Sequence, residues 1–103
     1  MNGPERDGIG IGPGARLRRT AGIAWREIEG EAVLVDVRRD EVIHLNPVAA
    51  FIWTRLDGNR SLAEVAAAIS DEFEVDAATA EADAVSFAGE LLERGAVEVV
   101  SLE

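Results

Sequence analysis

The sequence predicts an α+β domain in which a three-stranded antiparallel meander is followed by three helices. Three short segments between residues 21 and 45 alternate apolar with polar residues, and tight polar turns join them. Apolar residues then recur at helical spacing from residue 46 to about residue 95. The length of 103 residues is enough for one small domain with a modest core. The expected order is therefore β-β-β-α-α-α.

The N-terminal segment is rich in glycine and proline, so residues 1–15 are expected to be a flexible tail before a domain of residues 16–103. The run GIGIGPG within it resembles a dinucleotide-binding fingerprint. It follows no strand and opens no helix, so a phosphate-binding loop is not expected.

The three strands follow from alternation. Residues 23–26 alternate Ile and Trp with Ala and Arg, and residues 32–37 place three valines on one face and Ala32, Leu34 and Asp36 on the other. Residues 42–45 form the third strand after a polar turn that includes Asp40. Short connections between three consecutive strands favour an antiparallel meander.

The first helix has a clear start. Asn46 suits the N-cap and Pro47 suits the first helical position, where a missing N–H costs nothing. We expect Gly58 to end this helix in the left-handed conformation. The apolar stripe consists of Val48, Phe51, Ile52 and Leu56, with Trp53 alongside.

The second helix is predicted to begin with a capping box of Ser61 and Glu64. The third is expected to be capped by Asp76 or Thr79 and to end at Gly95, and the residues after it form either a closing strand or an extended tail.

Apolar residues of the third helix spread over about 160° of its circumference, more than the roughly 100° stripe of a one-sided surface helix. They are, in order around the helix, Phe87, Ala80, Leu91, Ala84, Ala88, Leu92 and Val85. Two interpretations stay open: the helix is central to the core, or one edge of the stripe covers the core and the other lines a groove.

No catalytic or metal-binding pattern is present in the sequence. The chain has no cysteine, and its one histidine, His44, has no serine in a nucleophile context and no clustered metal ligands to join. We therefore expect a non-enzymatic binding protein without cofactor or metal. The absence of a long apolar run predicts no membrane span and a cytoplasmic protein.

The net charge of −10 is concentrated in the second half of the chain, where three arginines face twelve acids. A nucleic-acid partner is not expected, because a phosphate-binding surface requires the opposite sign. A winged-helix DNA-binding regulator is retained only as the alternative function.

The third strand is a candidate docking edge because it ends the meander and has consecutive apolar residues, Val42 and Ile43. A strand covered on one face needs only alternate apolar residues. An exposed apolar edge is an aggregation hazard unless it is short or has a partner. Addition of a peptide strand to such an edge is a known recognition mode.

An ordered set of residues from about Arg16 to Val100 resembles the PqqD-like family, the peptide chaperones of pyrroloquinoline quinone biosynthesis and related precursor-peptide recognition elements. The matching positions are Leu45-Asn46, Ala49 or Ala50, Ile52-Trp53, Asp57-Gly58, Ser61, Glu64-Val65, Phe73, Phe87, Leu91 and Gly95-Ala96-Val97. Ala88 and Ala96 depart from this pattern, because leucines are expected there.

The resemblance implies a winged helix-turn-helix-like fold and a leader peptide that docks as an extra strand on the third strand, with the third helix as the other wall. Carried to this sequence, the peptide-binding residues are Asp40, Glu41, Val42, Ile43, His44, Leu45, Ala80, Asp83, Ala84, Phe87 and Leu91. The implied partners are a precursor leader peptide, as in lasso-peptide pathways, and a separate leader peptidase, cyclase or radical SAM protein. Weak pairing of two copies through the same edge is left open.

Overall fold

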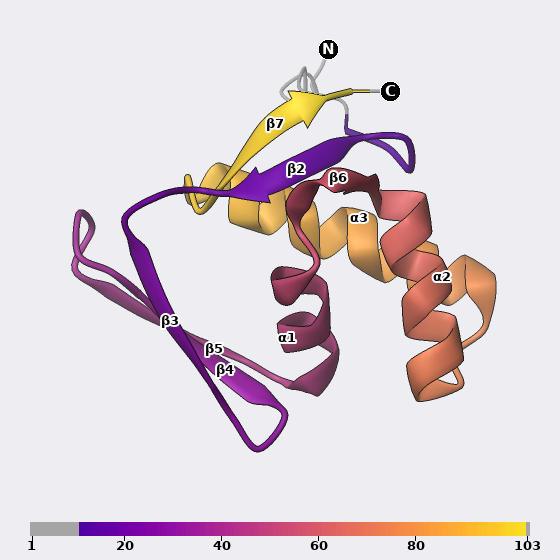
Figure 1. Cartoon of the computed structure of the whole chain (residues 1–103), viewed down its shortest axis with the longest axis horizontal. Helices are drawn as coiled ribbons and strands as arrows, with labels where there is room; N and C mark the ends of the chain where they lie inside the picture. The colour runs from indigo at the N-terminus through magenta and orange to yellow at the C-terminus, as the bar shows by residue number, and fades with distance from the viewer. Residues whose placement is uncertain (1–10, 103) are drawn as a thin grey trace, which may run out of the picture.

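The computed structural model describes residues 11–102, which form two small sheets and three helices (Figure 1). The elements in chain order are β2 (Arg16–Arg19), β3 (Ile23–Ile28), β4 (Glu31–Asp36), β5 (Glu41–Leu45), α1 (Pro47–Thr54), β6 (Asp57–Ser61), α2 (Leu62–Phe73), α3 (Ala77–Glu93) and β7 (Val97–Ser101). The predicted α+β class, with the meander ahead of three helices, is confirmed.

Most of the expected tail, residues 1–15, lies outside the described part of the chain, but its last residues contact the domain. Residues 1–10 lie outside the described part of the chain, whereas Ala15 is fully buried. The N–H groups of Leu62 and Ala63 donate to the carbonyl oxygens of Ala15 and Pro13, at 2.9 and 2.8 Å. The first N–H groups of a helix have no partner within the helix, so these bonds attach Pro13–Ala15 to the start of α2.

The meander of β3, β4 and β5 is antiparallel, with β5 at one edge. Leu34 lies opposite both Trp25 and Ile43, and Leu34 and Ala32 are buried on the inner face. The valine face of β4 is the outer one, and Val37 beyond its end is 74% exposed. The predicted alternation of β4 is therefore present. Its buried face carries Ala32, Leu34 and Asp36, and the valines lie on the outer face.

A second sheet, in the order β6-β2-β7, was not expected from the sequence. Both β2 (RLRR) and β6 (DGNRS) are short and polar, so neither has the apolar alternation that indicates a strand. Both segments form strands through pairing and not through an apolar pattern. β2 lies between β6 and β7, and its Leu17 is buried (Figure 1). The C-terminal segment is a strand, β7, which confirms one of the two expectations for it.

The prediction that Gly58 ends the first helix was wrong. The helix ends at Thr54 with Arg55 as its C-cap, and Gly58 belongs to β6. Its φ of +86° is nonetheless left-handed, and a Cβ at this position would lie 3.4 Å from Val100 and 3.5 Å from Arg18.

The carbonyl groups at the end of α1 are satisfied by a residue of the unexpected strand β2. The Nη1 atom of Arg19 donates to the carbonyl oxygens of Trp53 and Thr54 at 3.0 Å and of Leu56 at 3.3 Å. The guanidinium also lies over the rings of Trp25 and Trp53, whose planes meet edge to face. A single arginine therefore connects β2, β3 and α1.

The predicted helix starts are confirmed. The side chain of Asn46 accepts from the Ala49 N–H, Pro47 is the first residue of α1, and Ser61 and Glu64 form a reciprocal capping box. Asp76, rather than Thr79, caps α3. The helix ends at Glu93, and Gly95 follows with a φ of +73°.

The core lies where the three helices meet the inner faces of the sheets. Helix α3 is central to it, since Ala80, Ala84, Ala88 and Leu91 are buried along one face. Its partly buried flank, with Phe87, faces a surface pocket. Both interpretations of the broad apolar arc therefore hold for different parts of the same helix. No helix in the described range 11–102 combines the length and apolar character needed to cross a bilayer.

Candidate functional site

Strand β5 has an unpaired edge. Within residues 11–102 it pairs only with β4, through registers that run from Glu41 opposite Asp36 to Leu45 opposite Ala32. Val42 and His44 are exposed, Ile43 is half-buried and Leu45 is buried. Backbone N–H and C=O groups on the side of β5 away from β4 are therefore available to another strand.

A pocket of about 340 Å³ opens where β5 passes into α1. Its apolar lining comes from both helices, since Val48, Ala49 and Ile52 of α1 face Phe87 of α3. Its polar lining residues are Asn46, Asp83, Ser86 and Glu90. The pocket begins at Asn46, which directly follows β5. We therefore treat the open strand edge and the pocket together as one candidate site, which we call the β5–α3 groove.

The expected binding residues divide into two groups in the structure. Asp83 and Phe87 line the pocket, and Asp40 to His44 lie on or next to the open strand. The side chains of Leu45, Ala80, Ala84 and Leu91 are in the core instead, because they lie on the faces that pack against α1 and α2. Ala88 and Ala96, where leucines were expected, are also buried in the core and do not line the pocket.

Several pocket residues were not expected, among them Ala49, Ser86 and Glu90. A signal for two of them was present in the sequence. Asp83, Ser86, Phe87 and Glu90 are spaced i, i+3, i+4 and i+7, which places them in one column on the helix. Of the polar residues in this column, Asp83 was expected, whereas Ser86 and Glu90 were missed.

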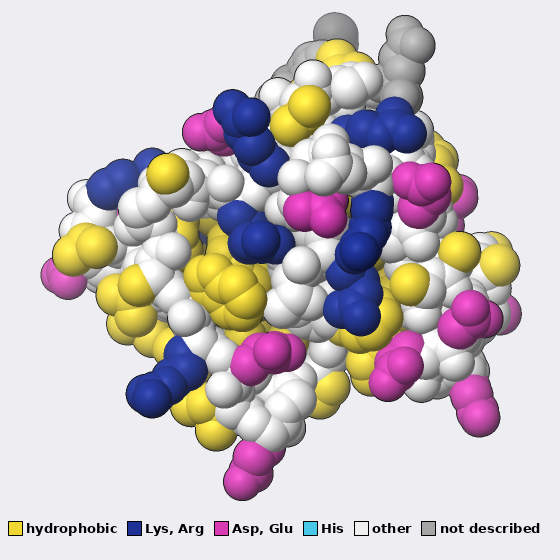
Figure 2. Space-filling model, viewed as in Figure 1, with side chains coloured by type: hydrophobic (Ala, Val, Ile, Leu, Met, Phe, Trp, Pro, Cys, Tyr) yellow, Lys and Arg dark blue, Asp and Glu magenta, His cyan; other side chains and the backbone are white. Residues whose placement is uncertain are grey.

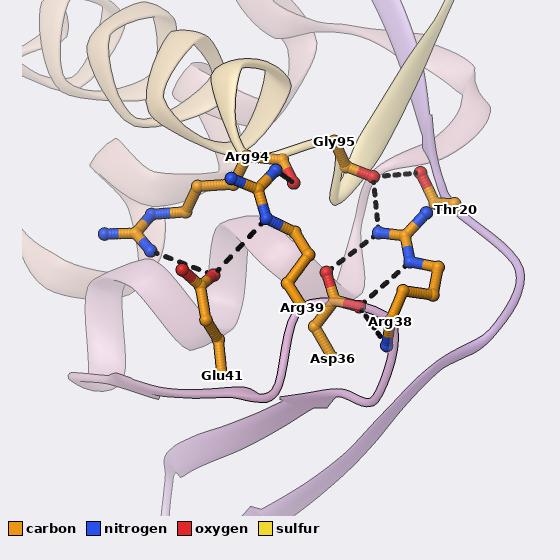
Figure 3. Close-up of polar contacts among 7 residues, drawn as sticks. All are labelled: Thr20, Asp36, Arg38, Arg39, Glu41, Arg94 and Gly95. Carbon is orange, nitrogen blue, oxygen red and sulfur yellow. Dashed lines mark hydrogen bonds and ion pairs between the residues drawn. The ribbon is translucent and has the colours of Figure 1, made fainter.

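A hydrogen bond and an ion pair connect the turn between β4 and β5 to the end of α3 (Figure 3). Nη1 of Arg39 donates to the carbonyl oxygen of Arg94 at 2.7 Å. Glu41 at the start of β5 accepts from Arg94 at 3.5 Å and lies 3.8 Å from Nε of Arg39. These contacts hold β5 and α3, the two walls of the groove, at a fixed separation at one end.

A second set of contacts lies beside the first (Figure 3). The buried carboxylate of Asp36 accepts two hydrogen bonds from the Arg38 guanidinium, at 2.9 and 2.8 Å. Arg38 also donates to the carbonyl oxygen of Gly95, which accepts from the Thr20 hydroxyl as well (Figure 3). The hydrogen bonds from Arg38 lower the pKa of Asp36 against the opposing effect of burial, and Asp36 raises the pKa of Arg38.

Catalytic geometry is not seen at the groove. His44 is exposed on β5, and residues 11–102 contain no group of three or more His, Cys, Asp or Glu side chains that could hold a metal ion. The arrangement offers a backbone edge, an apolar pocket and carboxylates at the pocket rim, which are features suited to binding an extended chain.

Comparison with protein families gives a match between residues 31–97 and the family described as coenzyme PQQ synthesis protein D (PqqD). A relative in Xanthomonas axonopodis pv. citri (strain 306), named PqqA binding protein, is 33% identical over 76 residues, which are 74% of this chain and 83% of that protein. A PqqA binding protein of Xanthomonas oryzae pv. oryzae (strain PXO99A) is 36% identical over 55 residues, which are 53% of this chain and 60% of that protein.

Solved structures show the same fold. A lasso peptide synthetase B1 complexed with the leader peptide matches with a TM-score of 0.72 and 33% identity, over 82% of this chain and 99% of that one. TbiB1 in complex with the TbiA(beta) leader peptide matches with a TM-score of 0.71 and 26% identity, over 79% and 94%. The PqqD truncation of Methylobacterium extorquens PqqCD, a stand-alone RiPP recognition element, matches with a TM-score of 0.72 over 86% and 95%. At 20% identity, this last likeness concerns the fold alone.

Proposed function

Because this chain belongs to the PqqD family, we propose that it binds the leader segment of a ribosomally synthesised precursor peptide and presents it to a separate enzyme. The enzyme is a leader peptidase, cyclase or other modifying protein, and the chain itself takes no part in the chemistry. Relatives named for binding PqqA, and two similar proteins solved with leader peptides, support this proposal. The encounter takes place in the cytoplasm, where ribosomal precursors are made.

The observation that carries the proposal is the open edge of β5 beside a pocket. A leader in extended conformation adds a strand to Glu41–Leu45 through backbone hydrogen bonds, which provide affinity with little dependence on sequence. Side chains of the leader then enter the pocket over Phe87, which provides selectivity. The contacts of Arg39 and Glu41 with Arg94 join the two walls of the groove at one end.

The charge distribution disfavours the alternative of DNA binding. Residues 62–93, which include α2 and α3, contain nine acids and no arginine, lysine or histidine. A recognition helix of that charge would be repelled by phosphates.

The test first identifies candidate precursor peptides among the genes that neighbour the gene for this chain. It then measures binding of a fluorescein-labelled leader segment from such a peptide by fluorescence anisotropy. Two proline variants, Val42→Pro and Ile43→Pro, separate the strand edge from the fold. Successive N–H groups of a strand point to opposite sides, so one proline removes a bond to β4 and the other removes an outward donor.

Thermal unfolding identifies which of the two variants stays folded. That variant should lose binding, because it lacks a donor to the added strand. Val42→Ala is the matched control: it shortens an exposed side chain but keeps its N–H, and should bind within about threefold of the wild type. Wild-type binding by the folded proline variant would exclude strand addition at β5.

A further inference from the structure

We propose that Asp83 and Glu90 select leader peptides that carry an arginine or lysine two residues away from the apolar side chain in the pocket. This inference rests on the proposed function and specifies the chemistry of the bound segment. Strand addition uses the backbone of β5 and gives no role to the two carboxylates at the pocket rim, which are the subject of this proposal.

The positions of the two carboxylates on α3 bracket the apolar centre of the pocket. Asp83 precedes Phe87 by four residues and Glu90 follows it by three, so all three lie on one face of the helix. At a rise of 1.5 Å per residue, the two acids are separated by about 10 Å along the helix axis. A side chain seated over Phe87 therefore has a carboxylate on each side of it.

Neither carboxylate has a partner within the described part of the chain. Glu41 and Glu98 form ion pairs with arginines, whereas no ion pair or side-chain hydrogen bond of Asp83 or Glu90 is present among residues 11–102. Helices α1, α2 and α3 contain no basic residue within their bounds, and Arg94, four residues after Glu90, pairs with Glu41 instead. No ion pair within residues 11–102 therefore neutralises Asp83 or Glu90.

Charge is also separated on the face of the molecule that Figure 2 shows. Acidic side chains gather there over the α2 end, whereas arginines gather over β2 and β6 (Figure 2). A leader that approaches α3 meets a negative field, which favours a basic segment and disfavours an acidic one. Selection therefore includes repulsion of peptides with Asp or Glu at the same position.

The geometry of an extended peptide fits this arrangement. Residues two apart in a strand point to the same face and lie about 6.8 Å from each other. If an apolar residue fills the pocket, the residue two positions away passes the rim near Asp83 or Glu90. A long basic side chain can span the remaining distance, and arginine can form two parallel hydrogen bonds with one carboxylate.

A displayed library of random peptides tests the proposal, with immobilised full-length protein as the target. Wild type should enrich peptides in which Arg or Lys stands two residues from a large apolar residue. The variant Asp83→Asn/Glu90→Gln should keep the apolar preference and lose the basic one. Glu81→Gln/Glu93→Gln removes the same charge from exposed positions of α3 outside the pocket and should retain both preferences.

A peptide selected on wild type, and its Arg→Gln version, are then titrated against the three proteins by calorimetry. In about 0.05 M NaCl we expect Asp83→Asn/Glu90→Gln to weaken binding of the basic peptide about fivefold, and that of the neutral version less than about twofold. In about 1 M NaCl, where screening acts within about 3 Å, this difference should largely disappear.

Two outcomes overturn the inference and leave the proposed function intact: no basic preference on wild type, or equal loss of that preference in the Glu81→Gln/Glu93→Gln control. A third outcome bears on the proposed function instead. If the folded proline variant of β5 enriches the same peptides as wild type, those peptides do not bind by strand addition. The failure of one proposal is thereby distinguished from the failure of the other.

Discussion

The Nη1 atom of Arg39 lies 2.7 Å from the carbonyl oxygen of Arg94, so the turn between β4 and β5 is bonded directly to the residue that caps α3. The two residues are 55 positions apart in the sequence. Glu41 adds a carboxylate contact to both arginines. The spacing of the groove walls thus depends on polar contacts at one end, whereas the pocket at the other end is lined by side chains of α1 and α3.

Arg39→Gln should weaken both peptide binding and the fold. Loss of one partly exposed charged hydrogen bond is expected to lower the free energy of unfolding by about 0.5–1 kcal/mol. Affinity for the labelled leader should fall by about two- to fivefold, because loss of the contact lowers the free energy that holds the groove walls at their separation by the same amount, about 0.5–1 kcal/mol. Anisotropy and urea unfolding measure the two quantities.

The matched control for this change is Arg26→Gln. Arg26 is exposed on β3, and no polar contact of its side chain is present within residues 11–102. It should leave both stability and affinity unchanged. If Arg39→Gln loses stability as expected but binds the leader as tightly as wild type, the turn between β4 and β5 has no role in binding.

Asp36 should contribute to the acid sensitivity of the fold. Its pKa in the folded protein is below the usual 3.8, first because of the side-chain hydrogen bonds from Arg38. A carboxyl group with a lowered folded pKa stabilises the protein above its unfolded pKa, and this contribution is lost as the pH falls through the folded value. Asp36→Asn should therefore be less stable than wild type at neutral pH and should lose less stability on acidification.

Thermal midpoints measured from pH 7 down to about pH 2 test this expectation. Asp71→Asn is the control, because Asp71 is exposed on α2 and forms no ion pair within the described range. Parallel pH profiles for wild type and Asp36→Asn would show that Asp36 does not cause the acid dependence.

Ala49→Phe should block the pocket without unfolding the protein. Ala49 lines the pocket and is only partly buried, so a larger side chain can occupy the cavity of about 340 Å³. We expect affinity for the labelled leader to fall about tenfold or more, since a filled pocket excludes the anchoring side chain of the peptide. Ala67→Phe introduces the same ring at an exposed position of α2 and should bind normally. Unchanged binding by Ala49→Phe would place the anchor elsewhere.

Replacement by alanine should destabilise the protein at Gly58 and stabilise it at Gly89. Gly58 has a φ of +86°, which an L side chain rarely adopts, so Gly58→Ala is expected to cost about 1 kcal/mol or more. Gly89 lies within α3, and a Cβ there would meet no atom within 4 Å, so Gly89→Ala should stabilise the helix by about 0.5–1 kcal/mol. Urea unfolding compares the two, and a neutral Gly58→Ala would argue against the left-handed conformation.

The sequence by itself determined the elements whose signals are local. Asn46-Pro47 and the Ser61–Glu64 box mark helix starts through bonds that span three residues, so no distant partner is needed to predict them. The meander follows from alternation and short turns for the same reason. The resemblance to the PqqD-like family, read from an ordered set of residues, is confirmed by the family match.

Only the tertiary structure decided the elements and faces that depend on distant partners. Strands β2 and β6 are polar, and β2 takes its conformation from pairing with β6 and β7. The partners are far apart in the sequence: Arg16 of β2 pairs with Ser101 of β7, 85 positions later. The face of α3 that is buried, and the face that lines the pocket, depend on where α1 and α2 pack. Helical periodicity places Ala84 and Asp83 on a helix, but only packing against the rest of the chain assigns one to the core and the other to the groove.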